Sequence, residues 1–245
     1  MFPIIQLGPL AIQSAGLFVL ASIYIGMTLT EKRAVHSGLN SASLDNLVLF
    51  ALFGFLAGGR VSFALQNWDS FRASPLDIFS LNTALFDLTG GLAAGLIVVL
   101  VYGQRKGLAF WPTLDALTPF FATVMVGLGA SHLASGSAFG KETSLPWGIE
   151  LHGAMRHPSQ VYEVALALFI LSLVGLRKPF PAAGAQFLAF IAWTAGARLF
   201  LEAFRGDSAL VFGSLRLGQI LAWIVLASAL VGLERLQSRQ RMEIE

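Results

Sequence analysis

Long apolar runs separated by short polar connections dominate the chain, and they predict membrane-spanning helices. A helix needs about 20 apolar residues to cross the hydrocarbon core of a bilayer. Runs of that length recur along the 245 residues, and most of the charged residues fall between them. The pattern predicts about seven spans, at roughly 10–29, 46–66, 83–102, 112–135, 160–176, 183–205 and 215–234.

Composition favours the same interpretation. Hydrophobic residues make up 56% of the chain and charged residues only 12%, whereas a soluble domain carries about 25% charged residues. The mean hydropathy is +0.71. The length suits a single multi-span membrane domain over residues 1–245, with too few residues for a second large domain. The expected fold class is an all-α integral membrane protein.

Basic residues between the spans predict the orientation. They are more frequent after spans one, three, five and seven than in the opposite connections, and the positive-inside rule places such residues in the cytoplasm. We therefore expect the N-terminus outside and the C-terminus in the cytoplasm. The first run has no basic segment before it and no small-residue cleavage site, so we expect a retained helix. The basic residues that follow these four spans are Lys32, Arg33, Arg105, Lys106, Arg177, Lys178, Arg235, Arg239 and Arg241.

On this topology, most ionisable residues of the spans lie at one depth, near the outer leaflet. Charges in lipid are expensive and usually face a bundle interior or a water-filled cavity, where they mark function. Structural ion pairs or snorkelling anchors are the alternative explanation. Asp115 alone falls on the cytoplasmic side. The outer set consists of Arg60, Asp87, His132, His157, Glu163, Arg198 and Glu202.

The spacing within two spans sharpens this prediction. Arg198, Glu202 and Arg205 are four and three residues apart, so they share one helical face. Two guanidinium groups beside a carboxylate form an edge that suits a phosphate. Before the fifth span, Pro158 indicates a helix start. Ser159 there is either an N-cap or a substrate contact.

Several chemistries are not expected from this sequence. There is no cysteine, which excludes thiol catalysis and thiolate metal sites. The four histidines show no metal-ligand spacing, so neither a metal nor another cofactor is expected. The net charge of +2 gives no reason to expect a nucleic-acid partner.

The chain resembles the prolipoprotein diacylglyceryl transferase family from about residue 12 to its end. The most specific match is the stretch from Arg156 to Glu163, which is similar to the family's R-H-P-S-Q-L-Y-E. Gly58-Gly59-Arg60 resembles a G-G/A-R element of the second span. The segment from Arg198 to Arg205 resembles F-R-x-x-x-E-x-x-R, and Gly218-Gln219-Ile220 matches G-Q-I. A bundle of seven helices with this orientation is also what the resemblance implies.

The resemblance implies transfer of the diacylglyceryl group of phosphatidylglycerol to the cysteine thiol of a lipoprotein precursor, with release of glycerol phosphate. It also implies a bacterial plasma (inner) membrane protein, with phosphatidylglycerol, lipoprotein precursors and membrane lipids as partners. Arginines would bind the phosphate and Glu202 would orient one of them. We expect the catalytic residues to be Asp87, His132, Arg198 and Glu202, and the substrate-binding residues to be Arg60, His157, Ser159, Gln160, Glu163 and Arg205.

The sequence also departs from the family pattern. The family's G-R-x-G-N-F-x-N-x-E-x-x-G is replaced by the segment from Gly129 to Lys141, with His132 where the family has arginine. Its F-H-G-G becomes the segment from Asp87 to Gly91, so that histidine is absent too. Asp87 and His132 are the two candidates for a replacement base, because both are expected at the right depth.

Two other functions stay open on the sequence alone. One is a relative that binds phospholipid or lipoprotein without turning it over, because part of the family pattern is missing. The other is a small anion transporter. It is less favoured because the polar residues lie toward the outer side rather than the midplane, and no internal repeat is visible.

Overall fold

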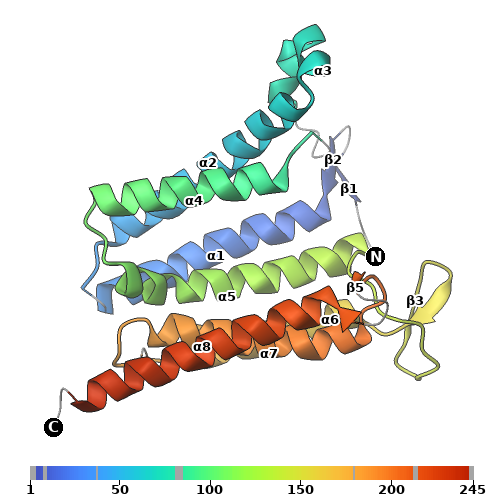
Figure 1. The fold of residues 1–245 in the computed structure, drawn as a ribbon. Helices are drawn as coiled ribbons and strands as arrows, with labels where there is room; N and C mark the ends of the chain where they lie inside the picture. Colours follow the sequence, from blue (N-terminus) through green and yellow to red (C-terminus); the bar gives the residue numbers. More distant parts are fainter. Residues whose placement is uncertain are drawn as a thin grey trace. The chain divides into compact units, whose positions relative to one another are not determined.

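The structure is a computed structural model, and it describes residues 4–7, 10–36, 38–80, 85–178, 180–211 and 215–242 (Figure 1). Long helices make up most of this part of the chain. Six of them are long and apolar enough to cross a membrane. They are α1 Ser14–His36, α2 Ser41–Gln66, α4 Leu88–Arg105, α5 Phe110–Ser135, α7 Ala185–Phe204 and α8 Leu217–Met242.

Shorter elements connect these helices. α6 Ser159–Ile170 continues into one π-helical turn, η2 Leu171–Gly175, and together they form a shorter apolar helix over Ser159–Gly175. α3 Trp68–Ala73 and the 3₁₀ turn η1 Pro75–Phe79 follow α2. The strands form three antiparallel hairpins, which pair β1 Ile4–Leu7 with β2 Leu10–Gln13, β3 Ile149–Leu151 with β4 Ala154–Arg156, and β5 Leu210–Val211 with β6 Leu215–Arg216.

The predicted fold class is confirmed, and each predicted span corresponds to a helix. The predicted start of the first span, at about residue 10, was wrong, because residues 10–13 belong to a hairpin and α1 begins at Ser14. In that hairpin Ile5 pairs with Ile12 and Leu7 with Leu10. Short apolar runs have the same hydropathy in a strand as in a helix, so hydropathy alone placed them in the helix.

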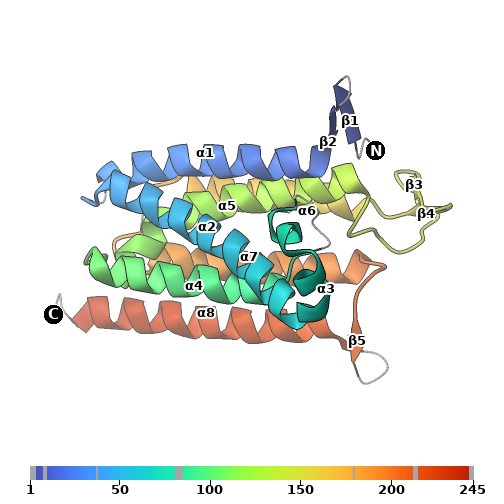
Figure 2. The same ribbon diagram turned by 90° about the horizontal axis from the view of Figure 1, so that it is seen from above.

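The chain divides into two compact units, and each is described by itself. Unit 1 contains residues 1–33 and 114–245, and unit 2 contains residues 34–113. In unit 1, α1 runs beside α5 (Figure 2), and α8 packs against α7. The core of unit 1 lies between α5, α6 and α7, with Phe190 stacked on Phe121 at 6.3 Å between ring centroids. Its buried residues are Ala122, Ile170, Val174, Ala189, Phe190 and Ala197.

Two charged side chains satisfy helix ends in unit 1. The carboxylate of Asp115 on α5 accepts hydrogen bonds from the backbone N–H groups of Gly184, at 2.5 Å, and Phe187, at 2.8 Å, which begin α7. Nη2 of Arg33 donates to the carbonyls of Gly175, at 2.7 Å, and Arg177, at 2.8 Å, where η2 ends. Helix termini leave such backbone groups without partners inside the helix, so these two side chains complete α7 and η2.

Unit 2 is built on the close antiparallel contact of α2 and α4. A Cβ atom at Gly58 would lie 2.2 Å from Cβ of Ala94, and one at Gly54 would lie 2.7 Å from Cγ2 of Val98. On the other helix, a Cβ at Gly91 would lie 2.9 Å from the carbonyl oxygen of Phe55. The small residues therefore allow the two backbones to approach, as is common between helices in lipid.

Gly58→Ala should lower the thermal unfolding midpoint of the purified protein in detergent. The added methyl overlaps Ala94, and overpacking of this kind costs about 1–3 kcal/mol. The matched control is Gly103→Ala on α4, because nothing lies within 4 Å of a Cβ there. A midpoint for Gly58→Ala equal to that of the control would show that this contact does not limit stability.

Candidate active site

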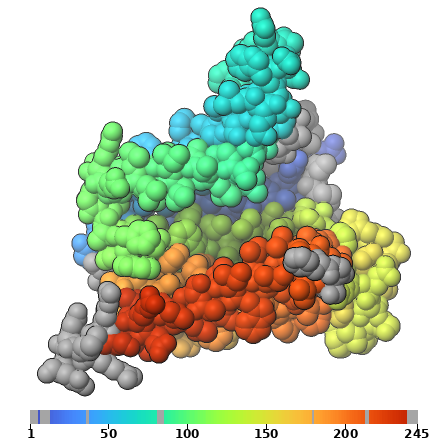
Figure 3. All heavy atoms as spheres, in the orientation of Figure 1, coloured from blue at the N-terminus to red at the C-terminus, as the bar shows by residue number. Residues whose placement is uncertain are grey.

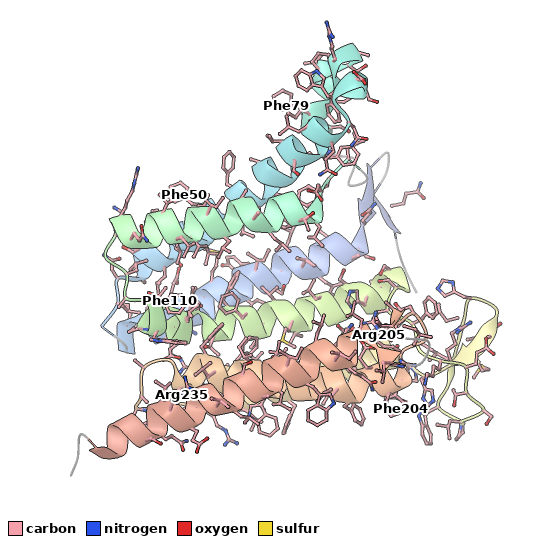
Figure 4. The ribbon with its side chains drawn as sticks, viewed as in Figure 1. Phe50, Phe79, Phe110, Phe204, Arg205 and Arg235 are labelled. Atoms are coloured by element: carbon pink, nitrogen blue, oxygen red, sulfur yellow. The ribbon has the colours of Figure 1, made fainter. Side chains whose placement is uncertain are left out.

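The predicted site residues of unit 1 lie at one end of its helices. At this end α5 and α7 finish, while α6 and α8 begin. Figure 4 shows Phe204 and Arg205 here, next to the β3–β4 hairpin, with Arg235 much farther along α8. The end therefore combines the last turns of two helices with the first turns of two others. His132, His157, Glu163, Arg198 and Glu202 all come from these turns or from the residues directly before them.

Residues 136–158, between α5 and α6, fold over this end. Figure 3 shows the segment, in yellow-green and yellow, as one lobe. The N–H of Lys141 donates to the carbonyl of Phe204 at 2.7 Å, and the N–H of Gly206 donates to the carbonyl of Phe139 at 2.9 Å. A Cβ at Gly140 would lie 2.2 Å from the carbonyl oxygen of His157, so only glycine permits this approach. The segment is thus fastened to the end of α7.

Ser159 and Gln160, at the start of α6, hold the first part of the same segment. The hydroxyl of Ser159 donates to the carbonyl of Ala138 at 2.7 Å, and Nε2 of Gln160 donates to the carbonyl of Ser137 at 2.9 Å. Both side chains are buried. Ala138 has a φ of 54°, a left-handed conformation that is unfavourable for alanine. These bonds hold the turn after α5 in place and connect it to α6.

Glu202 is a buried carboxylate with three polar neighbours. It is only 1% exposed. Its Oε1 lies 2.6 Å from Nη2 of Arg198, one turn earlier on α7. Its Oε2 accepts a hydrogen bond from the hydroxyl of Ser208 at 2.5 Å and lies 3.9 Å from Nη1 of Arg216. A buried charge is tolerated only when it is paired and hydrogen-bonded, as this one is.

Arg216, on β6, was not among the predicted site residues. Its Nη1 donates to the carbonyl of Glu202, to the carbonyl of Arg205 at 2.9 Å and to the hydroxyl of Ser208 at 3.0 Å. Arginines commonly bind the last carbonyls of a helix, so the position of Arg216 at the border of the seventh predicted span is the signal that could have identified it. Arg216 thereby joins the end of α7 to the start of α8.

Arg205 and Arg198 differ in how fully an acid partner occupies their N–H groups. Nε and Nη2 of Arg205 both donate to the carboxylate of Asp207, each at 2.9 Å, so the charge of Arg205 is balanced. Asp207 was missed as well, because nothing in its sequence context marks it. Arg198 is 42% exposed, and Glu202 is the only acid paired with it in the described part of the chain. Arg198 therefore presents N–H groups that a ligand can reach.

His132 and Glu163 form a pair between α5 and α6. Nδ1 of His132, in the last turn of α5, lies 2.9 Å from Oε2 of Glu163, in the second turn of α6. The side chains are 32% and 19% exposed, respectively. A Cβ at Gly129 would lie 3.0 Å from Val164 and 3.4 Å from Cγ of Glu163, so a glycine allows α6 to approach here. The sequence placed both residues at the same depth but did not pair them.

His157 lies in a cluster of aromatic side chains. Its ring centroid is 5.2 Å from that of Phe204 and 6.4 Å from that of Tyr162. The hydroxyl of Tyr162 accepts a hydrogen bond from Nε1 of Trp147 at 2.9 Å. Nδ1 of His157 is buried without a hydrogen-bond partner in the described residues. These contacts pack the ring of His157, which is itself part of the segment 136–158, against α6 and α7.

In unit 2, Arg60 lies on the wall of a cavity of about 470 Å³. Its Nη1 donates to the carbonyl of Leu85 at 2.7 Å and its Nη2 donates to the carbonyl of Ser80. No acid pairs with it within the ranges that the structure describes, so its charge is not neutralised there. Aromatic and aliphatic side chains supply the rest of the lining, which consists of Phe55, Leu56, Ile78, Phe79, Ser80 and Phe86.

Asp87 acts as the N-cap of α4. Its carboxylate accepts hydrogen bonds from the hydroxyls of Ser62 and Thr89, both at 2.6 Å, and from the N–H of Gly90 at 2.9 Å. These bonds, led by the one from Ser62, hold the pKa of Asp87 well below its usual range. A carboxylate so stabilised accepts a proton poorly. An aspartate directly before an apolar run is a known capping signal.

No group of three or more His, Cys, Asp or Glu side chains in the described residues is arranged to hold a metal ion.

Taken together, the fold and the contacts described above define the class of protein. It is a helical, multi-pass membrane protein in which arginines and the buried carboxylate of Glu202 lie at the ends of the spans.

Comparison with known proteins identifies the family. The sequence model of the prolipoprotein diacylglyceryl transferase family matches residues 3–234. Among curated relatives, the phosphatidylglycerol–prolipoprotein diacylglyceryl transferase of Oleidesulfovibrio alaskensis is 32% identical over 92% of this chain and 89% of its own length. The protein of the same name from Photobacterium profundum is 32% identical over 89% of this chain and 86% of its own length. The one from Nostoc is 26% identical over 97% of this chain and 90% of its own length. The chain therefore belongs to the prolipoprotein diacylglyceryl transferase family, an enzyme family.

Asp87→Asn should lower the thermal midpoint at neutral pH, because the amide has one acceptor oxygen in place of the two that Asp87 uses. Since the pKa of Asp87 is depressed in the folded state, its stabilisation is complete above the pKa of an unfolded aspartate, about 4. It is lost progressively as the pH falls below that value. The midpoints of wild type and variant should therefore converge in acid. The control is Asp77→Asn in η1, and a gap that stays constant with pH would contradict this role.

Proposed function

We propose that this protein transfers the diacylglyceryl group of phosphatidylglycerol to the cysteine thiol of a lipoprotein precursor and releases glycerol phosphate. Membership of the family supports this reaction, because the names of the relatives give phosphatidylglycerol, prolipoprotein and the transferred diacylglyceryl group. The observation that carries the proposal is the state of Arg198. Its side chain is 42% exposed and is held in position by Glu202, whose side chain is only 1% exposed.

The leaving group explains why such an arginine is needed. When the bond between the diacylglyceryl carbon and the phosphate oxygen breaks, negative charge grows on the phosphate. A guanidinium that is already in position stabilises that charge without having to reorganise. Ser208 and Arg216 also bind Glu202, so the carboxylate does not take up all of the charge of Arg198. Arg198 is thus the proposed phosphate ligand, and Glu202 orients it.

Arg60 is the second proposed anion binder, in unit 2. It combines an unneutralised guanidinium with the apolar walls of a cavity of about 470 Å³. Ligand sites in proteins commonly have this volume and a mostly apolar lining with a few polar groups. A phospholipid offers both matching parts, because acyl chains suit Phe55 and Phe79 while the phosphate suits Arg60. We therefore retain Arg60 as a headgroup contact for phosphatidylglycerol.

The remaining predicted residues take supporting roles in the proposal. Ser159 and Gln160 hold the turn after α5, and His157, near the end of the segment 136–158, packs against Phe204 of α7. Because the charge of Arg205 is balanced by Asp207, we assign Arg205 to the fold of the α7 end rather than to the phosphate. Asp87 is assigned to capping α4.

We also propose that the protein lies in the bacterial inner membrane with its N-terminus outside and its C-terminus in the cytoplasm. The excess of lysine and arginine after the odd-numbered spans supports this orientation. In that orientation the end of unit 1 that carries Arg198 and Glu202 meets the outer leaflet, where an exported precursor arrives.

The absence of cysteine allows a direct test of this orientation, because one introduced cysteine is the only reactive thiol. Ser144→Cys, in the segment 136–158, should react in intact cells or spheroplasts with a maleimide that does not cross membranes. The matched variant Ser238→Cys, near the end of α8, should react only after the membrane is opened. Both serines are exposed. The opposite labelling pattern would reverse the topology.

Arg198→Ala should reduce transfer from labelled phosphatidylglycerol to a lipobox-cysteine peptide by about 100-fold or more, the usual cost of removing a group that stabilises developing charge. The assay uses purified protein in detergent. Arg235→Ala on α8 is the control and should keep wild-type activity, because Arg235 lies far along α8 from this end (Figure 4).

Each other outcome has a definite meaning. If Arg198→Ala keeps wild-type transfer, the phosphate is held elsewhere. If the wild-type protein binds the labelled lipid but transfers nothing, the alternative of a lipid-binding relative without turnover replaces the proposed enzyme.

A further inference from the structure

The His132–Glu163 pair has the geometry of a base held by a carboxylate. An ionised carboxylate only accepts hydrogen bonds, so the 2.9 Å contact requires the hydrogen of the neutral imidazole to be on Nδ1. The lone pair is then on Nε2. No hydrogen bond to Nε2 is found in the residues that the structure describes. The 32% exposure of the His132 side chain leaves this nitrogen accessible to a ligand.

The surrounding structure fixes this pair rather than leaving it to surface side chains. His132 is in the last turn of α5 and Glu163 is in the second turn of α6, where Gly129 permits close approach. Ser159 and Gln160 connect the start of α6 to the turn after α5 through buried hydrogen bonds. The two helix ends therefore cannot separate without breaking those bonds.

We infer that His132 is the base that takes the proton from the substrate cysteine, and that Glu163 is the positioning residue that fixes its tautomer and orientation. This inference rests on the proposed function. The thiolate is the reactive form of cysteine, and the thiol has a pKa of about 8.5. At neutral pH a base is needed to form it, and histidine is the side chain best suited to that task.

The step balances as follows. The thiol proton moves to Nε2 of His132, which makes the imidazole an imidazolium. The sulfur electron pair forms a bond to the diacylglyceryl carbon that bears the phosphate. The bond between that carbon and the phosphate oxygen breaks, and its electron pair leaves on glycerol phosphate beside the arginine. The imidazolium then releases its proton to the product phosphate or to water, which restores the neutral base.

The other candidates are less suited to this step. Asp87 is committed to capping α4, and its pKa is held well below the usual range. His157 packs against Phe204 and Tyr162, and its Nδ1 is buried without a carboxylate partner in the described residues. Nε2 of His152, at the turn of the β3–β4 hairpin, lies 3.3 Å from the carbonyl of Gly136. Among His132, His152 and His157, only His132 contacts a carboxylate in the described residues.

The test compares two acceptor peptides that differ in one atom, a lipobox peptide with cysteine and the same peptide with selenocysteine. A selenol ionises below neutral pH, so it needs no base. His132→Gln should lose about 100-fold or more of the transfer to the cysteine peptide, the usual contribution of general base catalysis. Its transfer to the selenocysteine peptide should stay within about 10-fold of wild type.

Two further variants complete the comparison. Glu163→Gln retains an oxygen that accepts the Nδ1 hydrogen, so it should lose less transfer to cysteine than Glu163→Ala does. In both variants, the ratio of transfer to the selenocysteine peptide over transfer to the cysteine peptide should be larger than it is in wild type. Arg198→Ala should lose transfer to both peptides alike, because the phosphate must be held whichever nucleophile attacks.

The outcomes separate this inference from the proposed function. If wild type transfers to both peptides and His132→Gln loses both equally, His132 is structural and the inference is wrong, while the proposed function stands. If wild type transfers to neither peptide, the proposed reaction itself is overturned, and the proton transfer with it. Lipid binding and the thermal midpoint of His132→Gln, compared with wild type, identify a variant that has merely unfolded.

Discussion

The buried carboxylate of Glu202 organises the end of unit 1 that carries the proposed chemistry. A charge that is 1% exposed is sustained only by its partners, and losing one partner of such a pair typically costs about 3–5 kcal/mol. Here the partners come from α7 itself, from Ser208 and from β6. A Cβ at Gly218, the second residue of α8, would lie 2.4 Å from Oε1 of Glu202, so a glycine there lets α8 begin close to the carboxylate. The position of Arg198 therefore depends on a buried carboxylate and on the groups that hold it.

The cations show that the role of a charged residue in this protein is set by its partners rather than by its type. Arg33 binds helix-end carbonyls, Arg205 is neutralised by Asp207, and Arg216 ties two helices together. Arg198 contacts Glu202 through Nη2, and no other acid pairs with it in the described residues. The resemblance implied that Arg60, Arg198 and Arg205 bind an anion, whereas the contacts give Arg205 an acid partner and leave Arg60 and Arg198 as the proposed anion binders.

The sequence predicted the fold better than the site because hydropathy is local and pairing is not. Apolar runs of span length identify helices one at a time, which is why each predicted span corresponds to a helix. The ion pair between Arg198 and Glu202 follows from an i, i+4 spacing and was also visible. By contrast, Arg33 reaches a carbonyl 142 residues away, and His132 reaches a carboxylate 31 residues away. Only the folded chain brings such partners together.

A histidine beside Glu163 can do what a permanent cation there could not. An arginine in contact with this carboxylate would only balance its charge, because a guanidinium does not release its proton in proteins. His132 contacts the carboxylate through Nδ1, and its second ring nitrogen can take a proton and give it back. Asp87, the other candidate base, accepts hydrogen bonds from Ser62, Thr89 and Gly90 as the cap of α4. The contacts therefore favour the end of α5 over the start of α4 as the place of the proposed proton transfer.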